Sequence, residues 1–532
     1  MINKIKHSPL GLSLFCGILL FAGWTPYPLF FLVFIAWIPL LQLMELGVKQ
    51  GKSTLWFWKW SYLSMFIWNL GTTWWVWFAS KGGAIAMLFA NSFLMSLVLS
   101  AVFFTRKNLP KSSFTSLVVY WIAFELLHYN WDLDFPWLTL GNSLAMFPIF
   151  IQWYEYTGVL GGSFWILIVN IAIFKAVSHK RRFGFLKPAF LLFLPALISV
   201  WIYYTYTPPK QSKKVEVVIL QPNIDPYNEK FNRDPYDLTF EMLKSVQSHI
   251  SQKTCFLILP ETAIPEYFEE SEWNEEAKIQ LLYDLTKTYP NLSIITGLET
   301  YKRYNTEAQD CTKPTLTARS TDEPCTFIDV FNSSALISQN KAPVFYHKSK
   351  LVLGVEKMPY PKYLGFLEKL SITMGGTSGS LGRSEKPVLF FGADSTVTCG
   401  LICYESIFGN YVREFAQKGI HFITIITNDG WWRNTPGYKQ HLYYGAMRAI
   451  ETRKYIARSA NTGISAIIDE RGVIINRSQW WQKEVIKADI QTNTETTFYT
   501  RHGDLIGQGC KFVTIFMLLG AVVKRKTNIR KK

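Results

Sequence analysis

Residues 398–408 read TCGLICYESIF, an apolar run that ends in a thiol and continues into polar residues. The β-branched and apolar composition of 396–402 predicts a strand, with Cys403 at its end. Beyond the polar residues, the pattern predicts a helix over 411–418. A strand that passes through a polar turn into a helix is typical of a layered α/β domain.

Short apolar runs and polar helical stretches continue on both sides of this segment. Further strands are predicted over 215–220, 255–259, 293–296, 327–336, 344–346, 388–391, 422–427, 464–468 and 473–476. Helices are predicted over 235–253, 272–288 and 438–458. Together these elements predict an α/β domain of about 290 residues, made of packed layers.

The remainder of the chain is apolar, and 49% of all 532 residues are hydrophobic. With their flanks, most of its uncharged stretches reach about 20 residues, the length of a helix that crosses a bilayer. They lie at 10–25, 29–46, 60–79, 83–104, 114–127, 164–174, 189–206 and 512–523. Eight membrane spans are predicted, and the short stretches leave a count of seven open. The first is predicted to be uncleaved, because no small-x-small cleavage site precedes the second run.

Charge is distributed unevenly between these two parts. The whole chain has a net charge of +16, with 55 Lys and Arg against 39 Asp and Glu. Residues 207–510 hold 34 basic and 34 acidic residues, so the apolar remainder carries the whole net charge of +16. A neutral domain of this kind argues against a nucleic-acid-binding protein.

The excess of positive charge predicts the orientation in the membrane. If the amino terminus is cytoplasmic, 18 Lys and Arg residues fall in cytoplasmic segments, as the positive-inside rule requires. Eight spans then place both termini inside. The predicted domains are a transmembrane bundle of about seven helices over 1–206, an extracytoplasmic domain over 207–510, and a transmembrane helix with a basic cytoplasmic tail over 511–532.

Three residues that can carry chemistry follow predicted strands of the α/β domain. Glu261 follows the strand at 255–259, Lys348 follows the strand at 344–346, and Cys403 ends the strand quoted above. Each alone has an ordinary structural explanation. An acid, a cation and a thiol together are the parts needed for covalent acyl transfer: the acid takes the thiol proton, the thiolate attacks a carbonyl, and the cation stabilises the oxyanion.

The other cysteines and the histidines point to no cofactor chemistry. Cys311 and Cys325 flank a polar insert, where either a disulfide or two free thiols fit the sequence. The eight His residues are dispersed, and neither CxxC nor HExxH occurs. We therefore expect neither a metal nor a cofactor.

Six motifs give the domain a resemblance to a known superfamily. They are QPNI (221–224), LPET (259–262), YHKSKLV (346–352), ICYES (402–406), NDGWW (428–432) and SANTG (459–463). With them the domain resembles the carbon–nitrogen hydrolase, or nitrilase, superfamily, which implies an α-β-β-α sandwich and a Glu–Lys–Cys triad in that chain order. Fused to an apolar bundle and one C-terminal span, it resembles the bacterial apolipoprotein N-acyltransferase family.

The resemblance implies a role for each matching residue. Glu261 corresponds to the general base, Lys348 to the catalytic lysine and Cys403 to the nucleophile. The supporting positions of the family fall on Glu356, Tyr404, Glu405 and Trp431.

The segment after Lys348 has two further features. Gly354 and Val355 precede Glu356 in VLGVEKMP, a departure from the family, in which the glycine directly precedes this glutamate. Lys350 is the alternative catalytic lysine, because alternation along an extended segment would place it on the same side as Lys348.

The resemblance also implies the reaction. A fatty acyl chain would move from a phospholipid through a thioester on Cys403 to the N-terminal amine of diacylglyceryl-cysteine in a lipoprotein, by a ping-pong route. Residues 354–382 are the candidate lid. The implied setting is the bacterial inner membrane, with a periplasmic catalytic domain, a lipid bilayer and two lipid substrates as partners, and a monomeric enzyme without cofactor.

Three alternatives remain at this stage. A membrane-tethered nitrilase-superfamily amidase acting on a small amide would keep the triad but leave the span bundle unexplained. A non-catalytic membrane scaffold would be expected to lack a triad residue. A transporter would be expected to carry ionisable residues within its spans.

Overall fold

A computed structural model of the chain describes residues 8–179, 184–306, 311–360 and 380–530. Contacts divide the chain into two compact units. The first comprises Met1–Trp77, Lys81–Tyr206 and His502–Lys532, and the second comprises Phe78–Ser80 and Thr207–Arg501. The chain thus divides at 206 and 501, where the sequence predicts divisions at 206 and 510.

The first unit is helical, and each predicted apolar stretch overlaps at least one of its helices. The principal helices are α2 (Pro9–Ala22), α3 (Ile38–Lys49), α4 (Thr54–Thr73), α6 (Lys81–Asn108), α7 (Ser113–Leu127), α9 (Val159–His179), α10 (Leu186–Thr205) and α17 (Leu505–Arg530). α17 packs against α6 and α7, so the C-terminal helix belongs to the same bundle as the N-terminal ones.

Length and composition single out fewer membrane-spanning helices than the eight predicted. In the described ranges, five segments are long and apolar enough to cross a membrane: Phe30–Lys49, Lys81–Asn108, Val159–Ser178, Leu186–Thr205 and Leu505–Asn528. Pro9–Ala22 and Phe114–Leu127 are apolar but shorter. The bundle therefore has the apolar helices of a membrane protein, and the count of eight spans stays a prediction.

The second unit contains a large mixed sheet. Its main strands run in the order β15 (Glu484–Gln491), β1 (Lys214–Gln221), β2 (Thr254–Ile258), β4 (Ser293–Asn305), β6 (Thr326–Ser338) and β5 (Arg319–Ser320). β3 (Ile264–Glu269) pairs with β4, and β7 (Val344–His347) pairs with β6. β1, β2 and β4 are parallel neighbours. β15 runs antiparallel to β1, and β6 runs antiparallel to β4.

A second sheet faces the first. Its strands run in the order β10 (Leu401–Ile402), β11 (Ile423–Thr427), β12 (Ile456–Ala460), β13 (Ala466–Ile468) and β14 (Ile474–Arg477). β12 packs against β1 and β2, and β10 packs against β6. Helices α11 (Pro235–Val246) and α12 (Ala277–Thr288) pack on strands of the first sheet. Helices α14 (Gly409–Gln417) and α15 (Pro436–Thr452) pack together on the side of the second sheet, where α15 contacts the turns that follow β10 and β11. The predicted α-β-β-α sandwich is thereby confirmed.

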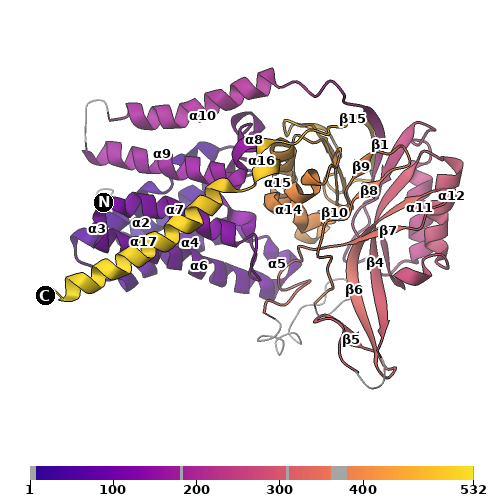
Figure 1. Cartoon of the computed structure of the whole chain (residues 1–532), viewed down its shortest axis with the longest axis horizontal. Helices are drawn as coiled ribbons and strands as arrows, with labels where there is room; N and C mark the ends of the chain where they lie inside the picture. The colour runs from indigo at the N-terminus through magenta and orange to yellow at the C-terminus, as the bar shows by residue number, and fades with distance from the viewer. Residues whose placement is uncertain (1–7, 180–183, 307–310, 361–379, 531–532) are drawn as a thin grey trace. The chain divides into compact units, whose positions relative to one another are not determined.

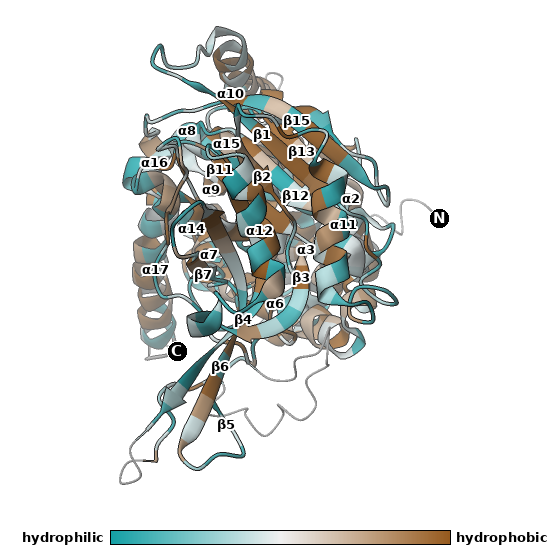
Figure 2. Cartoon of the chain, turned by 90° about the vertical axis from the view of Figure 1, so that its right-hand side faces the viewer, coloured by the Kyte–Doolittle hydropathy of each residue, from teal (hydrophilic) through white to brown (hydrophobic). Residues whose placement is uncertain are grey.

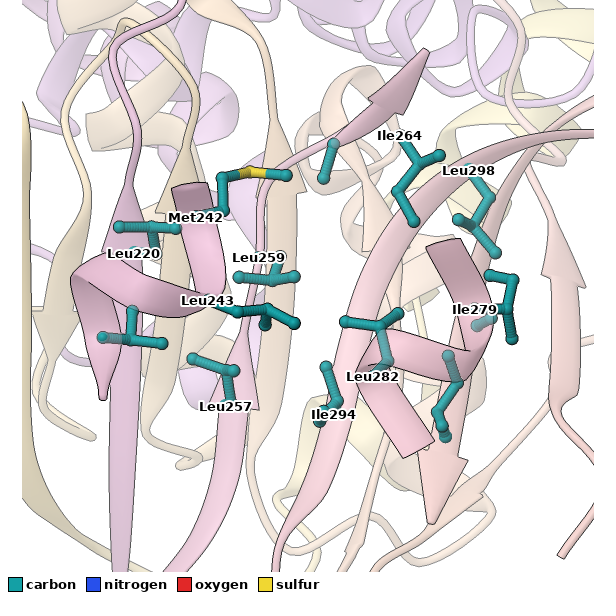
Figure 3. Close-up of a cluster of buried hydrophobic side chains, with 14 of the residues drawn as sticks. Leu220, Met242, Leu243, Leu257, Leu259, Ile264, Ile279, Leu282, Ile294 and Leu298 are labelled. Carbon is teal, nitrogen blue, oxygen red and sulfur yellow. The ribbon is translucent and has the colours of Figure 1, made fainter. Parts of the chain in front are cut away.

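Apolar periodicity explains why α11 and α12 lie on the sheet. α11 buries Leu238, Met242 and Val246, which recur every four residues along one face. Figure 2 shows hydrophilic residues on the face of these two helices that is turned to the viewer. Figure 3 shows the apolar faces of both helices meeting Leu257 and Ile294 of the strands in one buried cluster.

The sequence predictions differ from the structure at several places in this domain; for example, the helix predicted over 235–253 ends at Val246. The helix predicted over 438–458 ends at Thr452, where Arg453 takes a left-handed φ of +51°, and β12 follows it. The strand predicted over 396–402 is two short strands in different sheets, β9 (Val397–Thr398) and β10. β3, β5 and β15 have no predicted counterpart; in the edge strand β15 only Ile486 and Ile490 are buried, among exposed or partly exposed residues.

A long hairpin extends the first sheet. β4 and β6 pair along thirteen residues each and carry β5 near their far end (Figure 1). A disulfide joins Cys311 to Cys325 in this hairpin, which decides between the two alternatives left by the sequence.

Candidate active site

Glu261 lies in the loop that leaves β2, buried among polar partners. Its Oε1 accepts a hydrogen bond from Asn332 Nδ2 at 2.9 Å and lies 3.3 Å from Lys348 Nζ. Its backbone carbonyl accepts from Lys230 Nζ at 3.1 Å. The carboxylate is therefore fixed by an amide and an ammonium from two other segments of the chain.

Gly297 on β4 makes room for the loop that carries Glu261. A Cβ at this position would lie 2.4 Å from the Thr262 nitrogen and 2.6 Å from the Glu261 Cα, both of them backbone atoms. Thr262 already has a left-handed φ of +48°, so the loop has little freedom to move away.

We therefore expect Gly297→Ala to displace Glu261. The substitution should cost about 1–3 kcal/mol of stability by overpacking and lower the rate of acyl transfer. Thermal unfolding and an acylation assay measure the two effects. Gly445→Ala is the matched control, because its added Cβ would first meet Ile425 at an ordinary 3.5 Å; equal losses in both variants would contradict the interpretation.

Lys348 follows β7 and joins two carboxylates. Its buried Nζ lies 2.7 Å from Glu356 Oε1 and 3.3 Å from Glu261 Oε1. Asn332 Nδ2 donates to both of these oxygens, and the Asn332 backbone carbonyl accepts from the Lys348 nitrogen at 2.9 Å. Neighbouring strands thus hold one ammonium and one amide between the two acids.

Glu356 reaches this network from a tight turn. Its Oε2 accepts from the Val352 nitrogen at 2.8 Å. Gly354 has a φ of +78° within the same turn, a conformation that favours glycine. The departure from the family pattern at 354–355 therefore still places the carboxylate of Glu356 on Lys348.

Charge and burial set the protonation states of the group. Burial alone would raise the pKa of Glu261, but Lys348, with Asn332 and Lys230, outweighs it and holds this pKa below its ordinary value. Burial would lower the pKa of Lys348, yet Glu356 and Glu261 raise it. A charged carboxylate and a charged ammonium are therefore the resting forms.

Cys403 begins a short 3₁₀ turn, η8 (Cys403–Ile407), directly after β10. Its φ of +50° is unusual for a residue with a side chain and costs about 1–3 kcal/mol unless the surroundings impose it. Burial and the charge of Glu261 raise the pKa of its thiol, against the opposing effect of Lys348. The resting nucleophile is thus a thiol within electrostatic reach of the Glu261–Lys348 pair.

Glu405 connects the nucleophile turn to the segment after the catalytic lysine. Its fully buried carboxylate accepts from the backbone nitrogens of Ile402 at 2.8 Å and Ser349 at 2.7 Å, and from the Tyr346 hydroxyl. Burial raises the pKa of Glu405 to about 7, although these hydrogen bonds oppose the shift. Its contacts are those of a residue that fixes the relative position of two loops.

The two predicted aromatic positions have different surroundings. Tyr404 is buried with its ring edge-on to Phe408, 5.2 Å between centroids. Trp431 is half-buried, and its ring meets Tyr227 edge-on at 5.3 Å while its carbonyl accepts from the Tyr227 hydroxyl.

A pocket opens over part of this network. Its lining comprises Lys230, Phe231, Glu261, Thr262, Tyr267, Glu299, Asn332, Val355, Glu356, Leu381, Asn428 and Trp431. Both acids and Trp431 therefore face one space, whereas Lys348, Cys403, Tyr404 and Glu405 are buried outside this lining. Residues 361–379 of the predicted lid lie outside the described residues.

The expectation that Lys350 lies on the same side as Lys348 is wrong. Its ammonium lies 5.1 Å from the centroid of the Phe408 ring and 5.6 Å from that of Tyr411. β7 ends at His347, so the alternation of an extended strand does not continue to Lys350.

Sequence reasoning missed Asn332 and a buried group behind the nucleophile. Within the described ranges, one set of side chains has the spacing of metal donors: a sulfur of Cys403, an oxygen of Asp429 and a ring nitrogen of His441 lie within 4.8 Å of one another. Hydrogen bonds already engage both nitrogens of His441, and Arg458 Nη2 donates to Asp429 at 2.6 Å. The geometry favours a hydrogen-bonded network over metal ligation.

Comparison with known proteins agrees with the fold and the architecture. The family model described as "Carbon-nitrogen hydrolase" matches residues 212–499, so the second unit is a carbon–nitrogen hydrolase domain. The model described as "Apolipoprotein N-acyltransferase N-terminal domain" matches residues 16–172. Together with a relative that is 30% identical over 99% of this chain, these matches show that the chain belongs to the apolipoprotein N-acyltransferase family.

Two relatives named apolipoprotein N-acyltransferase support this assignment. The apolipoprotein N-acyltransferase of Chlorobaculum tepidum is 30% identical over 99% of this chain and 98% of its own. That of Geobacter metallireducens is 26% identical over 80% of this chain and 78% of its own. Among solved structures, Nit3 of Saccharomyces cerevisiae matches with 15% identity and a TM-score of 0.36, over 53% of this chain and 93% of that chain.

Proposed function

We propose that this enzyme moves a fatty acyl chain from a phospholipid to the N-terminal amine of a diacylglyceryl-cysteine in a lipoprotein, through a thioester on Cys403. One observation carries the proposal: Lys348 bridges Glu261 and Glu356 in a carbon–nitrogen hydrolase domain whose Cys403 stands in a strained turn. Glu261, Lys348 and Cys403 are the proposed triad.

The first step forms the thioester. Cys403 Sγ attacks the ester carbonyl while Glu261 takes the thiol proton, and the Lys348 ammonium stabilises the oxyanion. Because the pKa of the thiol is raised and that of Glu261 is lowered, the proton moves with the attack rather than before it. The C–O bond then breaks, and Glu261 returns the proton to the departing lysophospholipid oxygen.

The second step transfers the acyl chain. The neutral α-amine attacks the thioester carbonyl, the C–S bond breaks, and an amide forms. Glu261 takes one proton from the amine nitrogen and passes it to the Cys403 sulfur, which restores the resting enzyme. Aromatic and apolar residues of the pocket, Phe231, Tyr267, Leu381 and Trp431, would limit hydrolysis of the thioester by water.

We also propose that the enzyme is a monomeric protein of the bacterial inner membrane. Its termini are cytoplasmic and its catalytic domain is periplasmic, the orientation that the charge distribution predicts. The disulfide between Cys311 and Cys325 is independent support, because disulfides persist in oxidising compartments such as the periplasm.

This orientation predicts a difference in thiol labelling. In intact spheroplasts without reductant, Cys311 and Cys325 should resist a membrane-impermeant maleimide, and prior addition of a reductant should make both reactive. A cysteine introduced at Lys526 in the C-terminal segment should stay unlabelled until the membrane is permeabilised. Labelling of that tail position in intact spheroplasts would contradict the proposed orientation.

The function itself is tested with labelled substrates. Purified enzyme incubated with a phospholipid carrying a heavy-isotope acyl chain should show the acyl mass on the Cys403 peptide, removable by hydroxylamine. Addition of a diacylglyceryl-cysteine peptide should discharge the label onto its N-terminal amine. Absence of the acyl-thioester, together with hydrolysis of small amides, would favour the amidase alternative.

A further inference from the structure

Arg433 has a backbone conformation that favours glycine. Its φ is +52° and its ψ is −164°, directly after the short turn η9 (Asp429–Trp432). A residue with a Cβ is strained in this region, and such strain is kept mainly at functional sites. The side chain of Arg433 is exposed, so packing in the core does not account for an arginine at this position.

Two aromatic rings hold the guanidinium of Arg433. Its Cζ lies 4.9 Å from the centroid of the Phe78 ring and 5.7 Å from that of the Tyr227 ring. Phe78 belongs to the same compact unit as Arg433. Contacts with ring faces place the cation without neutralising it, so its N–H donors stay available for an anion.

No acid neutralises this cation in the part of the chain that the structure describes, where Arg433 forms no ion pair. The acid beside Tyr227 is engaged elsewhere: Asp225 accepts from the Tyr227 nitrogen at 2.8 Å and from Asn228 Nδ2 at 2.9 Å. An exposed guanidinium that is fixed in place and lacks an acid partner is suited to bidentate binding of a phosphate.

The guanidinium lies beside the pocket that contains the catalytic acid. Tyr227 meets the Trp431 ring edge-on at 5.3 Å and donates its hydroxyl to the Trp431 carbonyl at 2.7 Å. Trp431 lines the pocket together with Glu261. The Arg433 nitrogen donates to the Gly430 carbonyl at 3.0 Å, which fixes its backbone to the turn that carries Trp431. An anion bound to Arg433 would therefore lie next to the pocket in which the ester reacts.

The two proposed substrates differ in the charge that they bring to this place. The acceptor brings an α-amine, which is a cation when protonated, whereas a phospholipid donor brings a phosphate anion a few bonds from its ester carbonyls. We propose that Arg433 binds the phosphate of the phospholipid donor and so positions the acyl ester for attack by Cys403. The inference rests on the proposed function, because it assigns a recognition residue for that donor. The phosphate departs with the lysophospholipid, so Arg433 acts in the first step only.

Arg433→Gly tests this role without disturbing the fold, because glycine adopts a φ of +52° without strain. In the full-length enzyme with phosphatidylglycerol as donor, the KM for acyl-thioester formation should rise about tenfold or more, since a charge-assisted hydrogen bond to the donor is lost. The kcat should stay within about threefold of wild type, because the phosphate takes no part in the chemical step. Arg433→Lys keeps the charge but not the bidentate fork, so it should recover only part of the loss.

Two further readouts separate donor recognition from general damage. Thermal unfolding of Arg433→Gly should occur at the wild-type temperature or above it, because the substitution relieves backbone strain. Discharge of a preformed thioester onto a diacylglyceryl-cysteine peptide should keep its wild-type rate. Arg471→Gln is the matched control: Arg471 is also partly exposed, but its Nη2 already pairs with Asp469 Oδ2 at 2.9 Å, so the KM for phosphatidylglycerol should not change.

The outcomes distinguish this inference from the proposed function. A normal acyl-thioester in wild type, with an unchanged KM in Arg433→Gly, would overturn the role of Arg433. In that case, inhibition of wild type but not of Arg433→Gly by millimolar inorganic phosphate would identify a site for a free anion instead. Absence of any acyl-thioester in the wild-type enzyme would refute the proposed function itself.

Discussion

Replacement of Cys403 by alanine is expected to abolish both acyl-thioester formation and N-acylation, a loss on the order of a millionfold, as for other covalent nucleophiles. Cys403→Ser should be nearly as inactive. A hydroxyl is far harder to deprotonate than a thiol, and Lys348 and Asn332 already hold the pKa of Glu261 below its ordinary value, which makes it a weak base for that task.

The protein should remain folded in both variants. Alanine and serine keep a Cβ, so they meet the same strain at φ +50° as cysteine does, and the turn is held by Glu405 and Ser406 rather than by the sulfur. Thermal unfolding and membrane insertion should therefore match wild type.

Cys399→Ala is the matched control for the Cys403 variants. This cysteine lies four residues earlier, is equally buried, and its sulfur faces the Thr424 carbonyl at 3.9 Å. Its loss should lower stability through a small cavity and leave acylation intact. Acylation near the wild-type level in Cys403→Ala would disprove the nucleophile assignment.

Local pattern was sufficient to predict most elements of the catalytic domain. The strand ends that precede Glu261 and Lys348 follow short runs of apolar and aromatic residues, and a pairing in the sheet is not needed to find them. The helix predicted over 438–458 is too long, because it includes residues that form a strand in the structure. Helical spacing of apolar residues continues past Thr452. In the structure, however, Ile456–Ala460 forms hydrogen bonds with β11 on one side and β13 on the other, and local periodicity carries no information about such long-range strand pairing.

Contacts across the sheets explain what the sequence could not show at the site. Asn332 is one polar residue within a thirteen-residue strand, and its role follows only from the register that pairs it with Glu299 beside the Glu261 loop. His441 looks like an ordinary polar residue on an amphipathic helix. Its contact with the Cys403 carbonyl, 3.0 Å from Nε2, depends on how α15 packs against the turn after β10, which no spacing in the sequence encodes.

The choice between Lys348 and Lys350 is the second large prediction. Lys348→Met should lower thioester formation about 10³-fold, because it removes the cation that stabilises the oxyanion. Methionine keeps much of the volume, so the buried space stays filled, but the Glu261 and Glu356 carboxylates that shared this ammonium lose it as a partner.

The loss of the ammonium also predicts the direction of a pH effect. Lys348 is the largest of the influences that lower the pKa of Glu261 against burial, so this pKa rises in Lys348→Met. A base with a raised pKa is ionised only at higher pH. The acid limb of the residual pH–rate profile should therefore move upward, a shift that simple misfolding would not produce.

Lys350→Ala is the control that makes this prediction specific. Its ammonium stands over the rings of Phe408 and Tyr411, and its backbone nitrogen, which alanine retains, is the group that reaches Glu405 at 3.3 Å. We expect most of the acylation activity to remain and the pH profile to keep its position. An inactive Lys350→Ala beside an active Lys348→Met would exchange the two roles, and it would mean that the lysine buried between two acids is a structural ion pair.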